Sequence, residues 1–348
     1  MVATVSAIPR VAVILPAYGV AHLLGEALAS LQAQTMLEWE AVVIDDGALD
    51  DVVGTVAPFL TDPRIRFLAT ANHGVSEARN TAIAATRAPL IALLDGDDLL
   101  RPGYLAITVS VLETEPAARL VTVNARIFGA VARERRCFVV RQGRGDGLRG
   151  SLADVLDRSF KVYIGTTFRR ADFDHIGGFD PAMKHAEDFD LWVRLLTLGG
   201  EARFVDAVLG DYRVRANSAS AQGQRMLLGN IRVYEKARAL LAEDAPEQAL
   251  VTRLIAETQA SLAFEQAIDQ VIDGNTRRGL EELRAADGQV NGPVWGLSFK
   301  LWRMIPSLAR PMLKWRRRAH RRGNRPSTLS SLILRGGAWG PAARRPYL

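Results

Sequence analysis

The chain has 348 residues, of which 48% are apolar and 24% charged, a balance typical of a globular protein with a sizeable buried core. Its single cysteine, Cys137, excludes a disulfide within the chain and favours a reducing compartment. We interpret Cys137 as an inert thiol, because no histidine lies near it in sequence. No stretch approaches the roughly 20 apolar residues that span a bilayer, and the N-terminal run is more typical of a first strand than of a signal peptide.

The net charge of +6 is unevenly distributed along the chain. Residues 288–348 contain 13 Lys and Arg and no Asp or Glu, which leaves a net charge of −7 for the first 287 residues. The sequence therefore predicts an acidic body followed by a strongly basic C-terminal segment.

Strand and helix patterns alternate through the first 95 residues. This spacing predicts an α/β fold in which helices cover both faces of a mostly parallel sheet. We expect Ser76 to cap the last helix of the series. The expected strands are 10–15, 40–45, 65–70 and 89–95, and the expected helices are 21–34, 50–60 and 76–88.

The alternation is looser in the rest of the chain. The polar–apolar pattern after residue 220 is helical, with few turn signals. The expected elements are a helix at 103–114, a strand at 119–128, a strand and a helix within 162–180, a helix at 186–200, two short strands at 202–215, and helices over 222–285.

Three of the predicted strands end in polar or special residues, and ligands of open α/β sheets bind beyond the carboxyl ends of strands. Two carboxylates flanking a glycine can bind Mg²⁺ or Mn²⁺ together with phosphate oxygens, and we expect Gly96 to let a diphosphate approach closely. Taken alone, the two Asp-rich segments are more typical of solvated turns than of a binding site, but their match to the other strand ends favours the metal site. The three strand ends are Pro16-Ala17-Tyr18, Asp45-Asp46-Gly47 and Asp95-Gly96-Asp97-Asp98.

Glu187 and Asp188 open the predicted helix at 186–200, with His185 just before them. One interpretation is that they only complement the positive end of the helix dipole. The other is that they include a general base for an acceptor hydroxyl, with His185 contacting acceptor or phosphate. On composition alone, the first interpretation is favoured.

The order of these motifs resembles that of the family 2 inverting glycosyltransferases with the GT-A fold. The resemblance covers roughly residues 8–220, and its specificity lies in four blocks in the right order. These blocks are "VAVILPAY", "VVIDDGALDD", "GVSEARNTAIAATRAPLIALLDGDDLLRPGYL" and "GGFDPAMKHAEDFDLWVRL".

The resemblance implies roles for individual residues. It implies that Asp95 and Asp97 form the D-x-D motif that binds ribose and a metal-bound diphosphate, with Mn²⁺ or Mg²⁺ as the metal. Asp188 matches the catalytic base and Glu187 its support, while His185, Trp192 and Arg215 lie on the acceptor side. The residues implied to bind the nucleotide-sugar donor are Pro16, Ala17, Tyr18, Asp45, Asp46, Arg79, Asn80, Asp95 and Asp98.

Four positions depart from the family pattern. Gly19 replaces an asparagine, Ala48 a serine, Ala82 a glycine, and Arg215 a histidine, so that a histidine metal ligand is lacking there. These departures leave open a catalytically silent nucleotide-sugar-binding protein, although the retained carboxylate pairs argue against it. A nucleotidyltransferase is a further alternative, but the basic, glycine-rich loop expected after its first strand is missing.

The resemblance implies a non-processive bacterial enzyme that inverts the donor's anomeric centre, since no Q-x-x-R-W motif is present. We expect a UDP-sugar as donor and a saccharide or lipid-linked acceptor in the synthesis of a surface polysaccharide or glycolipid. The expected domains are a GT-A domain at 8–220, with its nucleotide half at 8–105 and its acceptor half at 106–220, a helical extension at 221–290 and a basic tail at 291–348.

The basic tail interleaves tryptophans and other apolar residues with Lys and Arg over 291–325. Such a segment suits an anionic membrane surface, which would place the protein in the cytoplasm at the inner face of the plasma membrane. Nucleic acid is a less favoured partner, and a solvated, disordered tail is the third interpretation.

Overall fold

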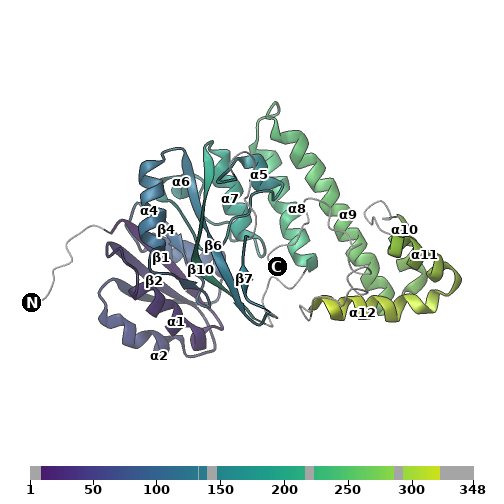
Figure 1. Cartoon of the computed structure of the whole chain (residues 1–348), viewed down its shortest axis with the longest axis horizontal. Helices are drawn as coiled ribbons and strands as arrows, with labels where there is room; N and C mark the ends of the chain where they lie inside the picture. The colour runs from purple at the N-terminus through teal and green to yellow at the C-terminus, as the bar shows by residue number, and fades with distance from the viewer. Residues whose placement is uncertain (1–8, 132, 139–146, 216–222, 286–292, 322–348) are drawn as a thin grey trace, which may run out of the picture. The chain divides into compact units, whose positions relative to one another are not determined.

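The computed structural model describes residues 9–131, 133–138, 147–215, 223–285 and 293–321. These residues form two compact units, the first ending at Arg215 and the second comprising the described residues from 223 onward (Figure 1). In these ranges no helix combines the length and the apolar character needed to cross a membrane.

The first unit is built on one sheet, to which the described residues contribute strands in the order β3-β2-β1-β4-β9-β6-β10-β5, with β7 beside β6 and β8 beside β10. β1, β2, β3, β4, β6 and β10 run parallel, and β9 lies antiparallel between β4 and β6. The predicted mostly parallel sheet is confirmed. The strands are β1 Val11–Ala17, β2 Trp39–Asp46, β3 Ile65–Thr70, β4 Leu90–Leu93, β5 Leu99–Leu100, β6 Ala118–Gly129, β7 Arg135–Arg136, β8 Arg149–Gly150, β9 Thr166–Arg169 and β10 Glu201–Val214.

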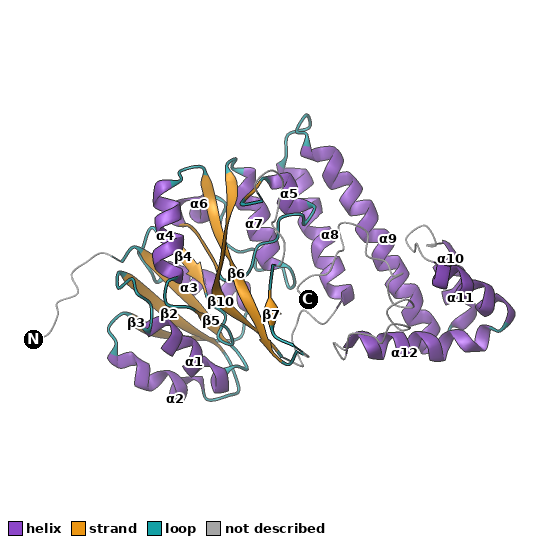
Figure 2. Cartoon of the chain, viewed as in Figure 1, coloured by secondary structure: helices purple, strands orange, loops and turns teal. Residues whose placement is uncertain are grey.

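The connections between the strands create a switch point beside β1. The chain runs outward from β1 to β2 and β3, then returns to β4 on the other side of β1. Because parallel crossovers are right-handed, α1 and α2 cover one face of the sheet and α3 the other (Figure 2). Ligands of such sheets bind between the ends of the two diverging strands, here β1 and β4. The helices are α1 Ala21–Gln32, α2 Val52–Val56 with a 3₁₀ turn at Ala57–Thr61, α3 Val75–Ala84, α4 Tyr104–Thr114, α5 Leu152–Leu156, α6 Arg170–His175 and α7 Glu187–Thr197.

Two expectations about these elements are wrong. Ser76 does not cap α3, because the helix already begins at Val75, after Gly74 at the N-cap, and the Ser76 side chain is buried in the first turn. The two short strands expected at 202–215 form one strand, β10. Its register against β6 shifts between residues 205 and 210, and such bulges bend a strand without ending it.

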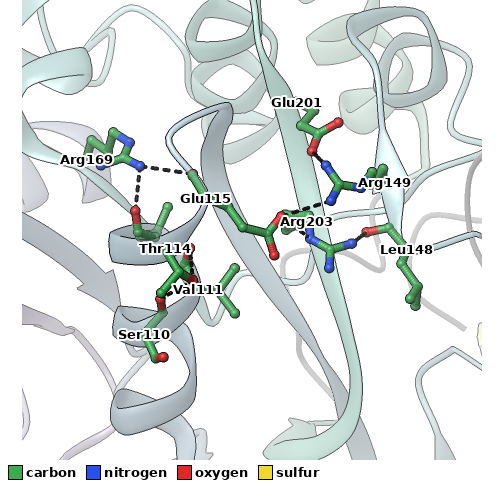
Figure 3. A network of polar contacts seen from close by, with 10 residues as sticks. Ser110, Val111, Thr114, Glu115, Leu148, Arg149, Arg169, Glu201 and Arg203 are labelled. Atoms are coloured by element: carbon green, nitrogen blue, oxygen red, sulfur yellow. Dashed lines mark hydrogen bonds and ion pairs between the residues drawn. The ribbon is translucent and has the colours of Figure 1, made fainter.

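A network of ion pairs joins the amino ends of β6 and β10 to α4 and β8 (Figure 3). Glu115, which follows α4, pairs with Arg203 Nε at 2.9 Å and with Arg149 Nη2 at 3.2 Å. Arg149 also pairs with Glu201, the first residue of β10. We call this end of the sheet the amino edge. In the network of Figure 3, two carboxylates meet two guanidinium groups, as expected for a structural role.

The second unit is helical, and its last four helices share a core. α9 contributes Phe264 to this core, and α11 contributes Trp295 and Trp302. The core residues are Phe264, Ala267, Ile268, Val271, Leu280, Leu283, Trp295, Phe299, Trp302, Ala309 and Leu313. The helices are α8 Gly223–Leu240, α9 Glu247–Asp273, α10 Thr276–Ala285, α11 Pro293–Met304 and α12 Ala309–Arg321, with a 3₁₀ turn at Pro306–Leu308 between the last two.

This core corrects part of the interpretation of the basic tail. Trp295, Phe299, Trp302 and Leu313 were expected among the residues facing a membrane, but they pack inside the second unit. Burying large aromatic side chains against α9 and α10 removes their apolar area from water without any lipid. Residues 291–292 and 322–348 of the predicted tail lie outside the described residues.

Candidate functional site

The sheet brings the three predicted strand ends together at one edge, which we call the carboxyl edge. β1 pairs with β2 up to Ala17 and Asp45, and with β4 up to Ile14 and Leu93. Tyr18, directly after β1, is 54% exposed. The residues after β1 and β4 thus flank the switch point of the sheet.

The turn after β1 explains one departure from the family pattern. Gly19 has a φ of 66°, in the left-handed region where glycine and asparagine are the least strained residues. The Asp50 carboxylate accepts hydrogen bonds from Gly19 N at 3.1 Å and Ala21 N at 2.6 Å, which fixes the turn. Replacing the family's asparagine with glycine therefore keeps the backbone conformation beside Pro16, Ala17 and Tyr18.

Both carboxylates at the end of β2 hold loops of the protein. Asp46 is buried and accepts hydrogen bonds from His73 N and Gly74 N, each at 2.9 Å. Asp45 accepts one from Ala48 N at 2.8 Å, within its own turn. Contact of Asp45 or Asp46 with a nucleotide base stays a prediction.

The structure gives a packing reason for glycine at position 96, separate from the expected approach of a diphosphate. A Cβ atom there would lie 2.9 Å from Val20 Cγ2 and 3.1 Å from Pro16 O. Gly96 therefore lets the turn after β4 pack closely against the end of β1, and its approach to a diphosphate stays a prediction.

Asp98 points into the protein and braces the carboxyl edge from within. Its carboxylate accepts hydrogen bonds from Tyr163 Oη at 3.1 Å and Arg213 N at 2.8 Å. Burial raises the pKa of Asp98 well above its ordinary value, and the charges of Asp95 and Asp97 raise it further. A donor contact for Asp98 stays a prediction.

Tyr163 and Arg213 were not among the predicted site residues. Arg213 donates from Nε to Asp97 O at 2.8 Å and pairs with Glu26 at 2.8 Å. It lies two residues before Arg215, so the strand alternation puts both side chains on one face of the chain, and this signal was available in the sequence. Nothing in the sequence around Tyr163 singles it out.

Asp97 and Arg215 form an ion pair at the carboxyl edge, with 2.7 Å between Asp97 Oδ2 and Arg215 Nε. Burial and the neighbouring Asp95 raise the pKa of Asp97, while Arg215 opposes this shift. One arginine therefore compensates the charge of Asp97 only in part.

Arg79 connects the end of β4 to the start of α7. Its side chain is 2% exposed, with Nη2 at 2.7 Å from Asp95 Oδ1 and Nη1 at 3.1 Å from Glu187 Oε1. Burial acts to lower the pKa of Arg79, but the charges of Asp95 and Glu187 outweigh it and the pKa is raised. Arg79 thus stays charged and fixes the two predicted motifs relative to each other.

The neighbouring Asn80 reinforces this connection. Its side-chain amide donates to Phe179 O at 2.8 Å and its amide oxygen accepts from Phe179 N at 2.9 Å. The Arg79 guanidinium also lies 5.4 Å from the centre of the Phe179 ring. In this structure Arg79 and Asn80 bind other parts of the protein, and their contact with a donor stays a prediction.

Glu187 and Asp188 stand in the first turn of α7, as expected. The residue before them, Ala186, has a φ of 58°, and strained non-glycine residues of this kind cluster at functional sites. Burial raises the pKa of Glu187, the charge of Asp188 raises it further, and Arg79 opposes both.

The predicted acceptor-side residues differ in how far they are buried. Trp192 is buried, with its ring centre 5.7 Å from that of Phe168, so it supports α7 from beneath. His185 is partly exposed just before α7. An acceptor contact for Trp192, His185 or Arg215 stays a prediction.

The ion pairs of the carboxyl edge join three carboxylates to two guanidinium groups. Among the described residues, no three His, Cys, Asp or Glu side chains are arranged to hold a metal ion by themselves. Asp95 and Asp97 nevertheless offer the oxygen ligands that Mg²⁺ and Mn²⁺ prefer, and these ions commonly complete their shells with phosphate oxygens. These two oxygen-bearing side chains therefore fit a divalent cation brought together with a phosphate ligand. The carboxylates of the ion pairs are Asp95, Glu187 and Asp97, and their partners are Arg79 and Arg215.

Comparisons with known proteins agree with this arrangement. A family model described as glycosyl transferase family 2 matches residues 12–177. The succinoglycan biosynthesis protein ExoU of Rhizobium meliloti is 30% identical over 257 residues, which cover 69% of this chain and 71% of ExoU. The UDP-Glc:alpha-D-GlcNAc-diphosphoundecaprenol beta-1,3-glucosyltransferase WfgD of Escherichia coli is 27% identical over 53% of this chain and 69% of WfgD.

Some curated relatives are much longer, and the chain spans 24% and 28% of the length of two of them. Among solved structures, the mannosyltransferase PcManGT of Pyrobaculum calidifontis, in complex with GDP-Man and Mn²⁺, matches with a TM-score of 0.57 at 20% identity, covering 88% of this chain and 87% of PcManGT. At this identity the likeness shows a shared fold alone.

Proposed function

The chain belongs to glycosyltransferase family 2 and has the GT-A fold, and from this membership we propose that it transfers a sugar from a nucleotide-sugar to a saccharide or lipid-linked acceptor. The observation that carries this proposal is the Arg79 bridge, which joins the D-x-D residue Asp95 to Glu187 beside the predicted base. Involvement in polysaccharide synthesis is supported by the similarity to ExoU and WfgD.

We assign donor binding to the switch point of the sheet. The exposed ring of Tyr18 is suited to stack on a nucleotide base, and Asp46 lies at the end of the neighbouring strand. A UDP-sugar is the proposed donor, supported by the UDP-Glc named for WfgD, while PcManGT was solved with GDP-Man.

Asp95 and Asp97 are the residues that would hold Mn²⁺ or Mg²⁺, and the bound cation would offset charge on the donor's diphosphate. Arg215 adds a positive charge beside Asp97, and we assign it to the same diphosphate. Arg79 is a positioning residue, because it is buried and acts through Asp95 and Glu187.

The proposed reaction is a single in-line displacement. Asp188 accepts the proton of an acceptor hydroxyl, whose oxygen forms a bond to the anomeric carbon. The bond from that carbon to the diphosphate oxygen breaks on the opposite face, and the nucleoside diphosphate leaves. One displacement inverts the anomeric centre, so an α-linked donor gives a β-linked product.

Asp188→Asn tests the assignment of the base. Loss of a general base lowers turnover by roughly 10²–10⁴-fold, so we expect sugar transfer to fall by this amount while UDP affinity, measured by calorimetry, is unchanged. Asp174→Asn, an exposed change on α6, is the matched control and should transfer sugar normally.

The wild-type chain is first screened against a panel of nucleotide sugars for hydrolysis and transfer. Near-normal turnover by Asp188→Asn would refute the base assignment. A wild-type chain that binds a nucleotide sugar but neither hydrolyses nor transfers it would instead identify a catalytically silent binding protein.

We further place the enzyme at the inner, cytoplasmic face of a membrane. The supporting observations are the basic composition of residues 288–348 and the lipid-linked acceptor in the name of WfgD.

A further inference from the structure

The apolar residues of α11 and of the turn after it divide into a buried and an exposed set. Trp295 and Trp302 are buried in the core of the second unit. Leu297 is 68% exposed, Met304 79% and Ile305 45%, and Leu308 is exposed as well. Exposed aliphatic side chains in close succession are unusual, because apolar surface residues of globular proteins are mostly scattered singly.

Helix geometry places these exposed residues together. Leu297 and Met304 are seven residues apart, or about two turns, so they share one face of α11. Lys300 lies between them on that face and Arg303 lies beside it, and both are exposed. The chain then turns through Ile305 to Leu308. We call Leu297, Lys300, Arg303, Met304, Ile305 and Leu308 the α11 strip.

The basic residues near the α11 strip have two different roles. Arg316 and Arg317 of α12 form ion pairs with Glu265, and Arg317 also pairs with Asp269, all within the second unit. Within the described ranges, Lys300 and Arg303 form no ion pair with an acidic side chain. The α11 strip therefore presents uncompensated positive charge next to exposed aliphatic groups.

This combination selects one kind of partner. A second copy of the same strip would bring like charges together, which opposes self-association. Sequence-tolerant nucleic-acid surfaces stack bases on aromatic rings, and the α11 strip has none, because Trp295, Phe299 and Trp302 are buried and the 46% exposed Trp315 lies on α12, outside the strip. A bilayer interface rich in anionic lipid offers apolar depth for Met304 and Ile305 and negative charge for Lys300 and Arg303.

We propose that the α11 strip is the surface through which the chain binds an anionic lipid bilayer, with Met304 and Ile305 inserted at the turn after α11. This inference deepens the proposed membrane attachment and rests on that part of the proposed function alone. Under this proposal, aliphatic residues enter the bilayer. The tryptophans of α11 stay in the core of the second unit and hold the strip in place.

The test is co-sedimentation of the full chain with vesicles of phosphatidylglycerol and phosphatidylcholine, compared with vesicles of phosphatidylcholine alone. We expect binding only to the anionic vesicles. The double variant Met304→Ser, Ile305→Ser should bind them at least fivefold more weakly, and Lys300→Glu, Arg303→Glu should abolish binding. Leu240→Ser, at an exposed leucine at the end of α8, is the matched control and should bind as the wild type does.

Equal binding by the wild type and the Met304→Ser, Ile305→Ser variant, with unchanged thermal unfolding, would overturn the proposal. So would a variant that elutes as a smaller species on gel filtration, or one that loses affinity for a single-stranded oligonucleotide while it keeps its affinity for vesicles. Hydrolysis of nucleotide sugars without vesicles should be the same in all variants, so failure of the lipid surface is distinguishable from failure of the glycosyltransferase assignment.

Discussion

The two edges of the sheet both carry networks of arginine and carboxylate groups, yet they differ in balance and burial. At the amino edge, Glu115 and Glu201 pair with Arg149 and Arg203, so that two carboxylates meet two guanidinium groups. At the carboxyl edge, Arg79 and Arg215 pair with three carboxylates, those of Asp95, Glu187 and Asp97, and Arg79 is almost completely buried. This difference suggests what to look for in a charged cluster. A cluster with more carboxylates than guanidinium groups indicates a ligand site, and the number of ion pairs alone does not.

The two edges differ for a reason of topology. At the amino edge, the strands that begin there are hydrogen-bonded to each other. The ion pairs there therefore only connect neighbouring segments. The carboxyl edge includes the switch point between β1 and β4. The chain leaves β1 toward β2 on one side, and β4 lies on the other side. Ligand groups can enter there.

The largest predicted difference between the edges comes from removing one arginine at each. Arg79→Met leaves Asp95 and Glu187 without their shared partner in a buried place, which costs about 3–5 kcal/mol. Arg149→Met removes a partly exposed partner at the amino edge, which costs about 0–1 kcal/mol. Urea unfolding measures both changes, and sugar transfer should be lost only in Arg79→Met. Equal loss of transfer in the two variants would erase the distinction between the edges.

A methyl group at the turn after β4 should produce a medium effect. Gly96→Ala places a Cβ against Val20 and Pro16, and overpacking of this kind costs about 1–3 kcal/mol. Gly25→Ala, inside α1 with no other atom nearer than 4.0 Å, should instead stabilise the chain by about 0.5–1 kcal/mol. Thermal unfolding should show a lower melting temperature for Gly96→Ala and a higher one for Gly25→Ala. A neutral Gly96→Ala would mean that the turn is free to move away from β1.

The smallest effect concerns Cys137, which neighbours the carboxyl-edge half of β6 through a hydrogen bond from its N–H to Ala125 O at 2.6 Å. Burial raises the pKa of the Cys137 thiol to about 12. Relative to an ordinary thiol, this lowers the thiolate fraction at pH 8 by roughly 10³-fold. Iodoacetamide should therefore label Cys137 slowly in the folded chain and rapidly in urea, as followed by mass spectrometry. Fast labelling of the folded chain would contradict the view that this thiol is inert.

Most of the first unit was predictable because its signals are local. The buried runs that became β1, β2, β3 and β4, and the helical spacing of α1 and α7, are set by neighbouring residues. The D-x-D and Glu-Asp motifs were equally visible as short strings. Their meeting at one edge follows from the parallel topology.

The contacts between distant segments were not predictable in this way. Arg79 was expected to bind the donor, but in the fold its guanidinium lies between Asp95 and Glu187, which is 108 residues further along the chain. Tyr163 bonds to Asp98 across 65 residues. Trp295 and Trp302 were expected to face a membrane for the same reason. A basic amphipathic pattern does not reveal that α9 and α10 provide a core in which these tryptophans are buried.

The most direct test of the central claim is a calorimetric titration of UDP into the full chain with and without Mn²⁺. If Asp95 and Asp97 of the carboxyl edge hold the diphosphate through a cation, removing Mn²⁺ should weaken UDP binding at least tenfold. Asp97→Asn should abolish the dependence on Mn²⁺, while Glu201→Gln at the amino edge should leave it intact. Equal UDP affinity of the wild type with and without Mn²⁺ would contradict the account.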